Sequence, residues 1–142
     1  MAANDIQHGG NHYASGAEYQ HWDWCEDTGM GYLESAASKY VSRWRQKNGI
    51  EDLHKARHYV EKLRELGRPN RQYRHPICDM IAKWTKFCNG AQMNSKEEII
   101  CRDLMVWRND YELEFVVEQI TAMIEAEGLK ILSRPMEDKH NG

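Results

Sequence analysis

The chain has 142 residues, of which 41% are hydrophobic and 29% are charged, so it suits one globular domain and is too apolar for a disordered protein. No apolar run approaches the roughly 18 residues of a membrane span, and the polar N-terminus lacks the charged and apolar regions of a signal peptide. We therefore expect a cytoplasmic protein without a membrane partner.

The net charge of −3 hides three blocks of different sign. Residues 1–38 carry six acidic and no basic residues (−6), residues 39–75 eleven basic and four acidic (+7), and residues 76–142 eight basic and twelve acidic (−4). The basic block suits a nucleotide or another small phosphorylated ligand. Extended nucleic acid is disfavoured, because the acidic flanks would repel a long phosphate backbone. Neutralisation of those flanks within the fold is the alternative.

The first half of the chain predicts a polar arm followed by three helices. Residues 1–16 are polar and rich in glycine, which is typical of an N-terminal arm. Beyond it, apolar side chains recur at helical spacing and glycine follows each stretch, which predicts helices over residues 17–28, 31–47 and 50–66. Only Asn48 and Gly49 separate the last two, so we expect an antiparallel helical hairpin. Residues 17–67 would form the core.

The second half predicts a linker and an appended helical segment. Residues 68–76 hold two prolines and three arginines with no apolar period, which indicates a loop. Helices are predicted from Ile77, from a capping box at Ser95, and from a cap at Asp110 up to a stop at Gly128. This C-terminal helical segment spans residues 77–132, with residues 129–132 as a strand or extended piece, and residues 133–142 are the tail. The predicted fold class is mainly all-α.

Three cations recur at every fourth position of the second predicted helix. Lys39, Arg43 and Lys47 would lie one above another on a single helix face, where each like-charged pair costs a few tenths of a kcal/mol. Such a column persists if the side chains fan into water, or if an anion binds between them. In the second interpretation these cations hold phosphates, and Arg43 can make a bidentate contact.

The start of the third predicted helix adds an anion-binding helix N-terminus and two carboxylates. The candidate nucleotide-binding residues in this stretch are Asn48, Gly49, Glu51, Lys55 and Tyr59. Asp52 or Glu51 can orient a hydroxyl, a water or Mg²⁺. The alternative is purely structural, with Glu51 paired to Lys55 at i,i+4 and Asp52 bridging Lys47 across the turn.

Three candidates lie earlier in the chain. His12 can fold over a pocket and donate to a phosphate while Tyr13 stacks on a base, or both can be surface residues. Asp23 faces either the pocket or solvent.

No metal site is expected, since the four cysteines fall in no CxxC pair and His54 and His58 lack a third ligand. The Walker phosphate loop is also absent.

Taken in order, these residues resemble a known family. Asn11-His12-Tyr13, Asp23, the run KYVSRWRQKNGIEDLHKA over residues 39–56 and then Tyr59 resemble a family of small bacteriophage proteins of unknown function, over about residues 11–66. One member is a nucleotide kinase that lacks a Walker loop and acts on deoxynucleoside monophosphates. The chain departs from the family where Ser35-Ala36 replace a usual Gly-Asn pair.

The resemblance implies a phage protein of the host-cell cytoplasm and leads to three hypotheses. The first is a deoxynucleoside monophosphate kinase-like enzyme without a P-loop, in which Arg43, Asp52 and Asp23 are the catalytic candidates. The second is a non-catalytic nucleotide-binding protein that sequesters a host nucleotide signal. The third and weakest is an all-α nucleotide pyrophosphohydrolase. The cofactor stays unknown, with Mg²⁺ as one option, and we expect a homo-oligomer.

Overall fold

The computed structural model describes residues 18–68, 73 and 75–133. Within these residues the chain forms six α-helices, one 3-10 turn and no strand, which confirms the predicted all-α fold. The elements are α1 (His21–Thr28), α2 (Tyr32–Arg43), the 3-10 turn η3 (Trp44–Gln46), α3 (Ile50–Glu65), α4 (Ile77–Gly90), α5 (Ser95–Val106) and α6 (Asp110–Leu132). None of these described helices is long and apolar enough to cross a membrane. The predicted arm, with His12 and Tyr13, lies outside the described residues.

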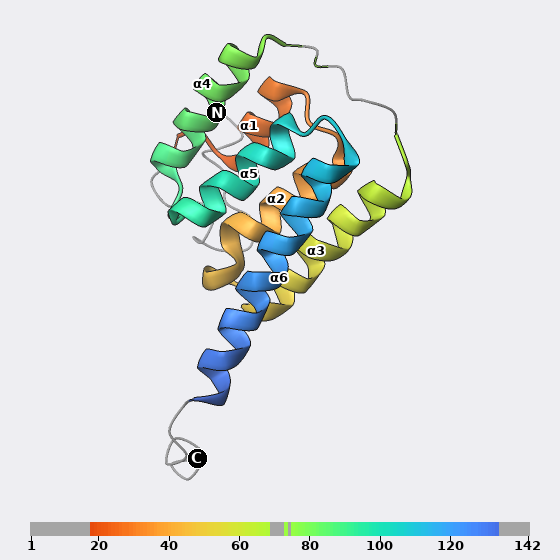
Figure 1. Ribbon diagram of the computed structural model, residues 1–142. Helices are drawn as coiled ribbons and strands as arrows, with labels where there is room; N and C mark the ends of the chain where they lie inside the picture. The colour runs from red at the N-terminus through yellow and green to blue at the C-terminus, as the bar shows by residue number, and fades with distance from the viewer. Residues whose placement is uncertain (1–17, 69–72, 74, 134–142) are drawn as a thin grey trace.

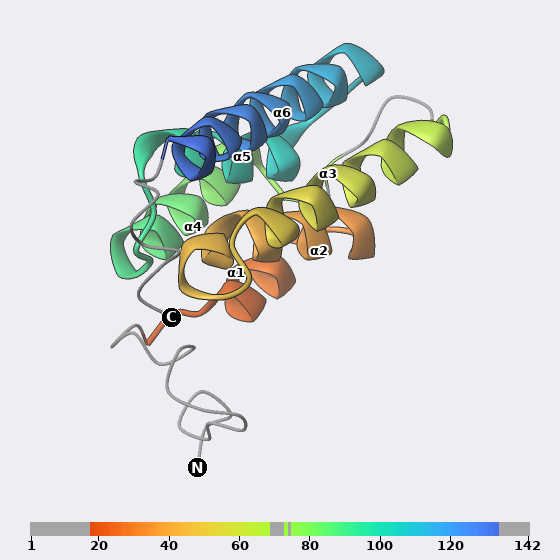
Figure 2. The ribbon, with the colours of Figure 1, turned by 90° about the horizontal axis from the view of Figure 1, so that it is seen from below.

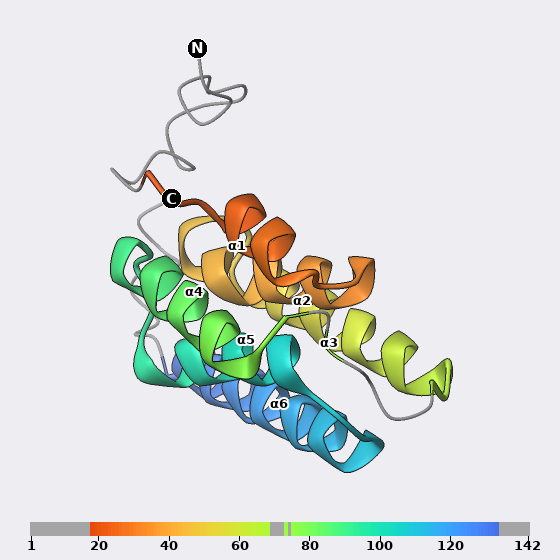
Figure 3. The same ribbon diagram turned by 90° about the horizontal axis from the view of Figure 1, so that it is seen from above.

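The helices form two layers, with α1, α2 and α3 in one and α4, α5 and α6 in the other (Figures 2 and 3). α3 returns alongside α2 after the turn, and α6 packs along α3 (Figure 1). α5 packs on α2, while α4 packs on α1 and on α5. The last turns of α6 extend beyond the other helices in Figure 1.

One hydrophobic core joins the two layers. The predicted apolar stripe of α3 is buried along its whole length, through Leu53, Ala56, Val60 and Leu63. The second layer contributes Ile100, Leu104, Leu113, Val116 and Ile120 to the same cluster. Trp24 of α1 stacks on Phe87 of α4 with 4.8 Å between ring centroids. Each layer therefore depends on the other to bury its apolar face.

The second helix is shorter than the sequence predicts. α2 ends at Arg43, and Lys47 follows the 3-10 turn with φ −121° and ψ −107°. At this turn the buried Glu97 of α5 accepts the indole N–H of Trp44 at 2.6 Å and a guanidinium N–H of Arg45 at 2.5 Å. Lys47 therefore does not continue a column of cations on one helix face, and that prediction was wrong.

Two other helix ends differ from the predictions. Asn94, not Ser95, caps α5, because its side chain accepts the backbone N–H of Glu97 at 2.9 Å. α6 begins after Asn109, whose side chain caps it, and continues through Gly128 to Leu132. A glycine costs a helix only about 1 kcal/mol compared with alanine, so one glycine did not stop this 23-residue helix.

Candidate functional site

Asn48, Gly49 and Asp52 build the turn between α2 and α3. Gly49 has φ 62° and ψ −135°, a conformation that glycine adopts readily and other residues do not, and its N–H donates to the carbonyl of Trp44 at 2.8 Å. Asp52 is fully buried, and its carboxylate accepts the backbone N–H of Asn48 at 3.4 Å and the side-chain amide at 3.3 Å. These three residues therefore fold the turn, and Asn48 does so without a positive φ.

Asp52 also lies next to Arg43 at the end of α2. Its Oδ2 is 3.8 Å from Nε of Arg43, so the observed carboxylate contact is with Arg43 and not the predicted bridge to Lys47. The guanidinium carbon of Arg43 lies 4.8 Å from the ring centroid of Tyr40. Because Asp52 is fully buried, it can orient Arg43 and hold the turn, whereas the Arg43 side chain retains 18% exposure toward solvent.

Three cations from two helices converge on the ring of Tyr40. Nζ of Lys39 lies 6.0 Å and Nζ of Lys55 5.5 Å from its centroid, and Arg43 completes the set, which we name the cation cluster (Lys39, Arg43 and Lys55). Lys39 and Lys55 form no ion pair with any described residue. An anion placed beside this ring would be attracted by all three positive charges.

His21 of α1 lies within reach of the positive potential of this cluster. Its Nε2 is 2.8 Å from the hydroxyl of Ser38, the residue before Lys39. Burial, and then the charges of Lys39 and Arg43, lower the pKa of His21 to about 4. The imidazole is therefore neutral at pH 7.

Two more tyrosines continue from the cluster along the hairpin. Tyr59 of α3 stacks on Tyr40 with 5.9 Å between centroids and 14° between planes, and Tyr32 meets Tyr59 edge-on at 6.3 Å. A hydrogen bond with Tyr32 is the main cause that raises the pKa of the Tyr59 hydroxyl. Sequence reasoning selected Tyr59 but missed the other two, although Tyr32 and Tyr40 lie eight residues apart on α2.

The remaining predicted residues lie elsewhere. Asp23 accepts the backbone N–H of Gln20 at 2.9 Å in the capping box of α1, so its carboxylate is engaged at a helix start. Lys47 and Glu51 are exposed beside the turn, and Glu51 makes no ion pair with Lys55 within 4.0 Å in the described structure. Among the described residues, no group of three His, Cys, Asp or Glu side chains can hold a metal ion.

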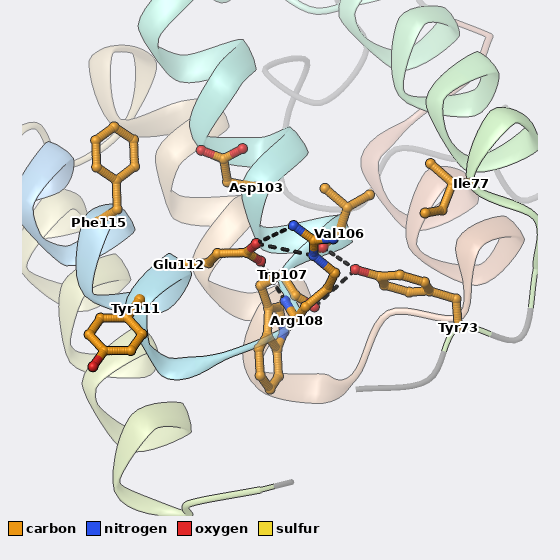
Figure 4. Close-up of a pocket in the computed structure, with 9 residues that line it drawn as sticks. All are labelled: Tyr73, Ile77, Asp103, Val106, Trp107, Arg108, Tyr111, Glu112 and Phe115. Atoms are coloured by element: carbon orange, nitrogen blue, oxygen red, sulfur yellow. Dashed lines mark hydrogen bonds and ion pairs between the residues drawn. The ribbon is translucent and has the colours of Figure 1, made fainter. Parts of the chain in front are cut away.

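A groove of about 370 Å³ lies on the opposite layer (Figure 4). Its lining is largely aromatic and aliphatic: Tyr73, Ile77, Asp103, Val106, Trp107, Arg108, Tyr111, Glu112 and Phe115. The polar groups are engaged: Arg108 donates to Glu112 at 2.9 Å, Arg102 donates to Asp103 at 3.2 Å, and the Tyr73 hydroxyl donates to the Val106 carbonyl. This groove thus offers no set of cations comparable to the cluster on the hairpin.

The comparison with known proteins bears on the hairpin. Residues 8–61 match a family described as a protein of unknown function, DUF3310. The DUF3310 match takes in α1, α2, the turn and most of α3, including the whole cation cluster. It supports the resemblance to a family of unknown function, while its description carries no activity. No curated protein and no solved structure matches the chain.

Proposed function

We propose that this protein binds a nucleotide through the cation cluster and transfers a phosphoryl group, as a deoxynucleoside monophosphate kinase-like enzyme without a P-loop. The observation that carries the proposal is the convergence of Lys39, Arg43 and Lys55 on one tyrosine ring. Two of these cations have no carboxylate partner among the described residues.

The roles follow from burial and contact. Lys39 and Lys55 would neutralise phosphate oxygens, and Arg43, oriented by Asp52, would contact them through its planar donor set. Phosphoryl transfer needs mainly positioning and electrostatic stabilisation of the charge that spreads over the transferring group. Asp52 would act here as a positioning residue, because full burial keeps its carboxylate from the ligand.

That burial also favours a second candidate. If Asp52 only orients Arg43, no described carboxylate in contact with the cluster remains to position an attacking hydroxyl. A non-catalytic protein that sequesters a nucleotide would need nothing more than the cluster. The phage origin, the host-cell cytoplasm and a homo-oligomeric assembly remain parts of either proposal. The exposed Leu129 and Leu132 on the projecting end of α6 suit such an assembly.

The decisive experiment combines binding with turnover. Calorimetry with deoxynucleoside mono- and triphosphates should detect binding that Lys55→Gln weakens by about 1.5–3 kcal/mol, the range for hydrogen bonds to charged groups. Lys62→Gln is the matched control, because Lys62 lies on the same helix and pairs with Glu65 at 3.5 Å. Equal affinity in the two variants would refute the phosphate site. Incubation of a deoxynucleoside monophosphate with a triphosphate donor should yield diphosphate, whereas binding with intact recovery of both would favour sequestration.

A further inference from the structure

A ladder of rings leads from the cation cluster to the start of α2. The guanidinium carbon of Arg43 lies 4.8 Å from the ring centroid of Tyr40. The ring centroid of Tyr59 lies 5.9 Å from that of Tyr40 and 6.3 Å from that of Tyr32. Tyr40 contacts both Arg43 and Tyr59 and is half-buried. Tyr32 ends the ladder with 77% of its surface exposed, so it presents most of its ring to solvent.

We infer that Tyr32, supported by Tyr59, is the platform on which the base of the bound nucleotide stacks. This inference rests on the proposed function, since it takes the cation cluster as the phosphate site. Stacking of a base on an aromatic side chain stabilises a complex by roughly 1–3 kcal/mol. The edge-on contact with Tyr59 already restricts the Tyr32 ring, so little side-chain freedom is lost when a base binds.

The distance between Tyr32 and the cation cluster sets the orientation of the nucleotide. Tyr32 and Lys39 are seven residues apart on α2, which at 1.5 Å per residue is roughly 10 Å along the helix axis. A base on Tyr32 would direct its sugar and phosphates along the hairpin toward Lys39 and Arg43. Every base has a π-face, so stacking is tolerant of base identity. The platform would therefore accept purine and pyrimidine nucleotides.

The test compares a ligand with a base to one without. Tyr32→Ala should weaken the binding of dGTP by roughly 5- to 100-fold, the range of base–aromatic stacking, and leave the binding of inorganic triphosphate unchanged. Tyr32→Phe should bind dGTP as the wild type does. Tyr111→Ala is the matched control, because Tyr111 is 82% exposed in the first turn of α6 and should affect neither ligand.

Each outcome separates the two proposals. If Tyr32→Ala binds dGTP like the wild type, the platform is wrong and the phosphate site stands. If that variant weakens both ligands equally, Tyr32 acts through the fold and the platform is also wrong. If the wild type binds neither dGTP nor inorganic triphosphate, the proposed function itself fails. Circular dichroism of the variants confirms that each retains its helices.

Discussion

Replacing Gly49 with alanine tests whether the turn between α2 and α3 depends on a backbone conformation that only glycine adopts readily. Gly49 has φ 62° and ψ −135°. A Cβ added at this position would meet no atom within 4 Å, so the substitution adds no steric clash. Its cost is then the backbone strain alone, about 1–3 kcal/mol for such a conformation. We expect Gly49→Ala to lower the free energy of unfolding by that amount.

Gly128→Ala is the matched control. Gly128 also has open space around it, but it lies inside α6, without a positive φ. Alanine is favoured over glycine within a helix by roughly 0.5–1 kcal/mol, so this variant should be more stable than the wild type. The same chemical change thus has opposite signs at the two sites, and only the backbone conformation distinguishes them.

Urea denaturation followed by circular dichroism measures both effects. With a dependence of about 1–3 kcal/mol per molar urea, a loss of about 2 kcal/mol moves the midpoint down by roughly 1 M. Protein concentration must be the same in all samples, because assembly would contribute to stability. The reasoning is refuted if Gly49→Ala unfolds at the wild-type midpoint or above it, or if both variants lose the same stability.

Two further predictions concern buried groups. Glu97→Gln should lower the free energy of unfolding by about 2–3 kcal/mol, because the carboxylate accepts hydrogen bonds from Trp44 and Arg45; a change below about 0.5 kcal/mol in urea denaturation would contradict this role. The stability should also fall as the pH drops from about 6.5 toward 4, since the pKa of His21 is lowered to about 4 and only the unfolded chain takes up the proton in that window. His21→Phe should remove this contribution of His21 to the free energy of unfolding, which amounts to at most about 3 kcal/mol. If wild type and variant show the same dependence of stability on pH, His21 makes no such contribution.

The helices could be predicted because their signals are local. The stripe that includes Leu53 and Leu63 recurs at helical spacing, and every member is buried. The contacts of the turn after α2 could not be predicted, because Trp44 donates to Glu97, which lies 53 residues further along the sequence and reaches it through the packing of α5 on α2. Contacts with such distant partners leave no trace in the periodicity of the sequence around Trp44.

The charged residues of the candidate site could be predicted from the sequence, but their arrangement in space could not. Lys39, Arg43 and Lys55 were selected as cations in a basic block, yet their meeting point is an aromatic ring. Tyr40 falls on the apolar stripe of α2, where its spacing indicates a core residue. Its ring is only half-buried, and the packing of α3 against α2 brings Lys55 and Tyr59 to it from the other helix. This packing depends on the tertiary structure, so the sequence around Tyr40 does not predict it.

A substitution of Asp52 would be a poor test of function, because this residue has more than one role. Its carboxylate holds the turn through Asn48 and also contacts Arg43, so a substitution there perturbs folding and ligand binding together. Lys55 differs, because it is exposed and its contact within the cluster is with the ring of Tyr40. A loss of affinity at Lys55 with unchanged stability therefore reports on the ligand alone, whereas the same loss at Asp52 would not distinguish a binding role from the folding of the turn.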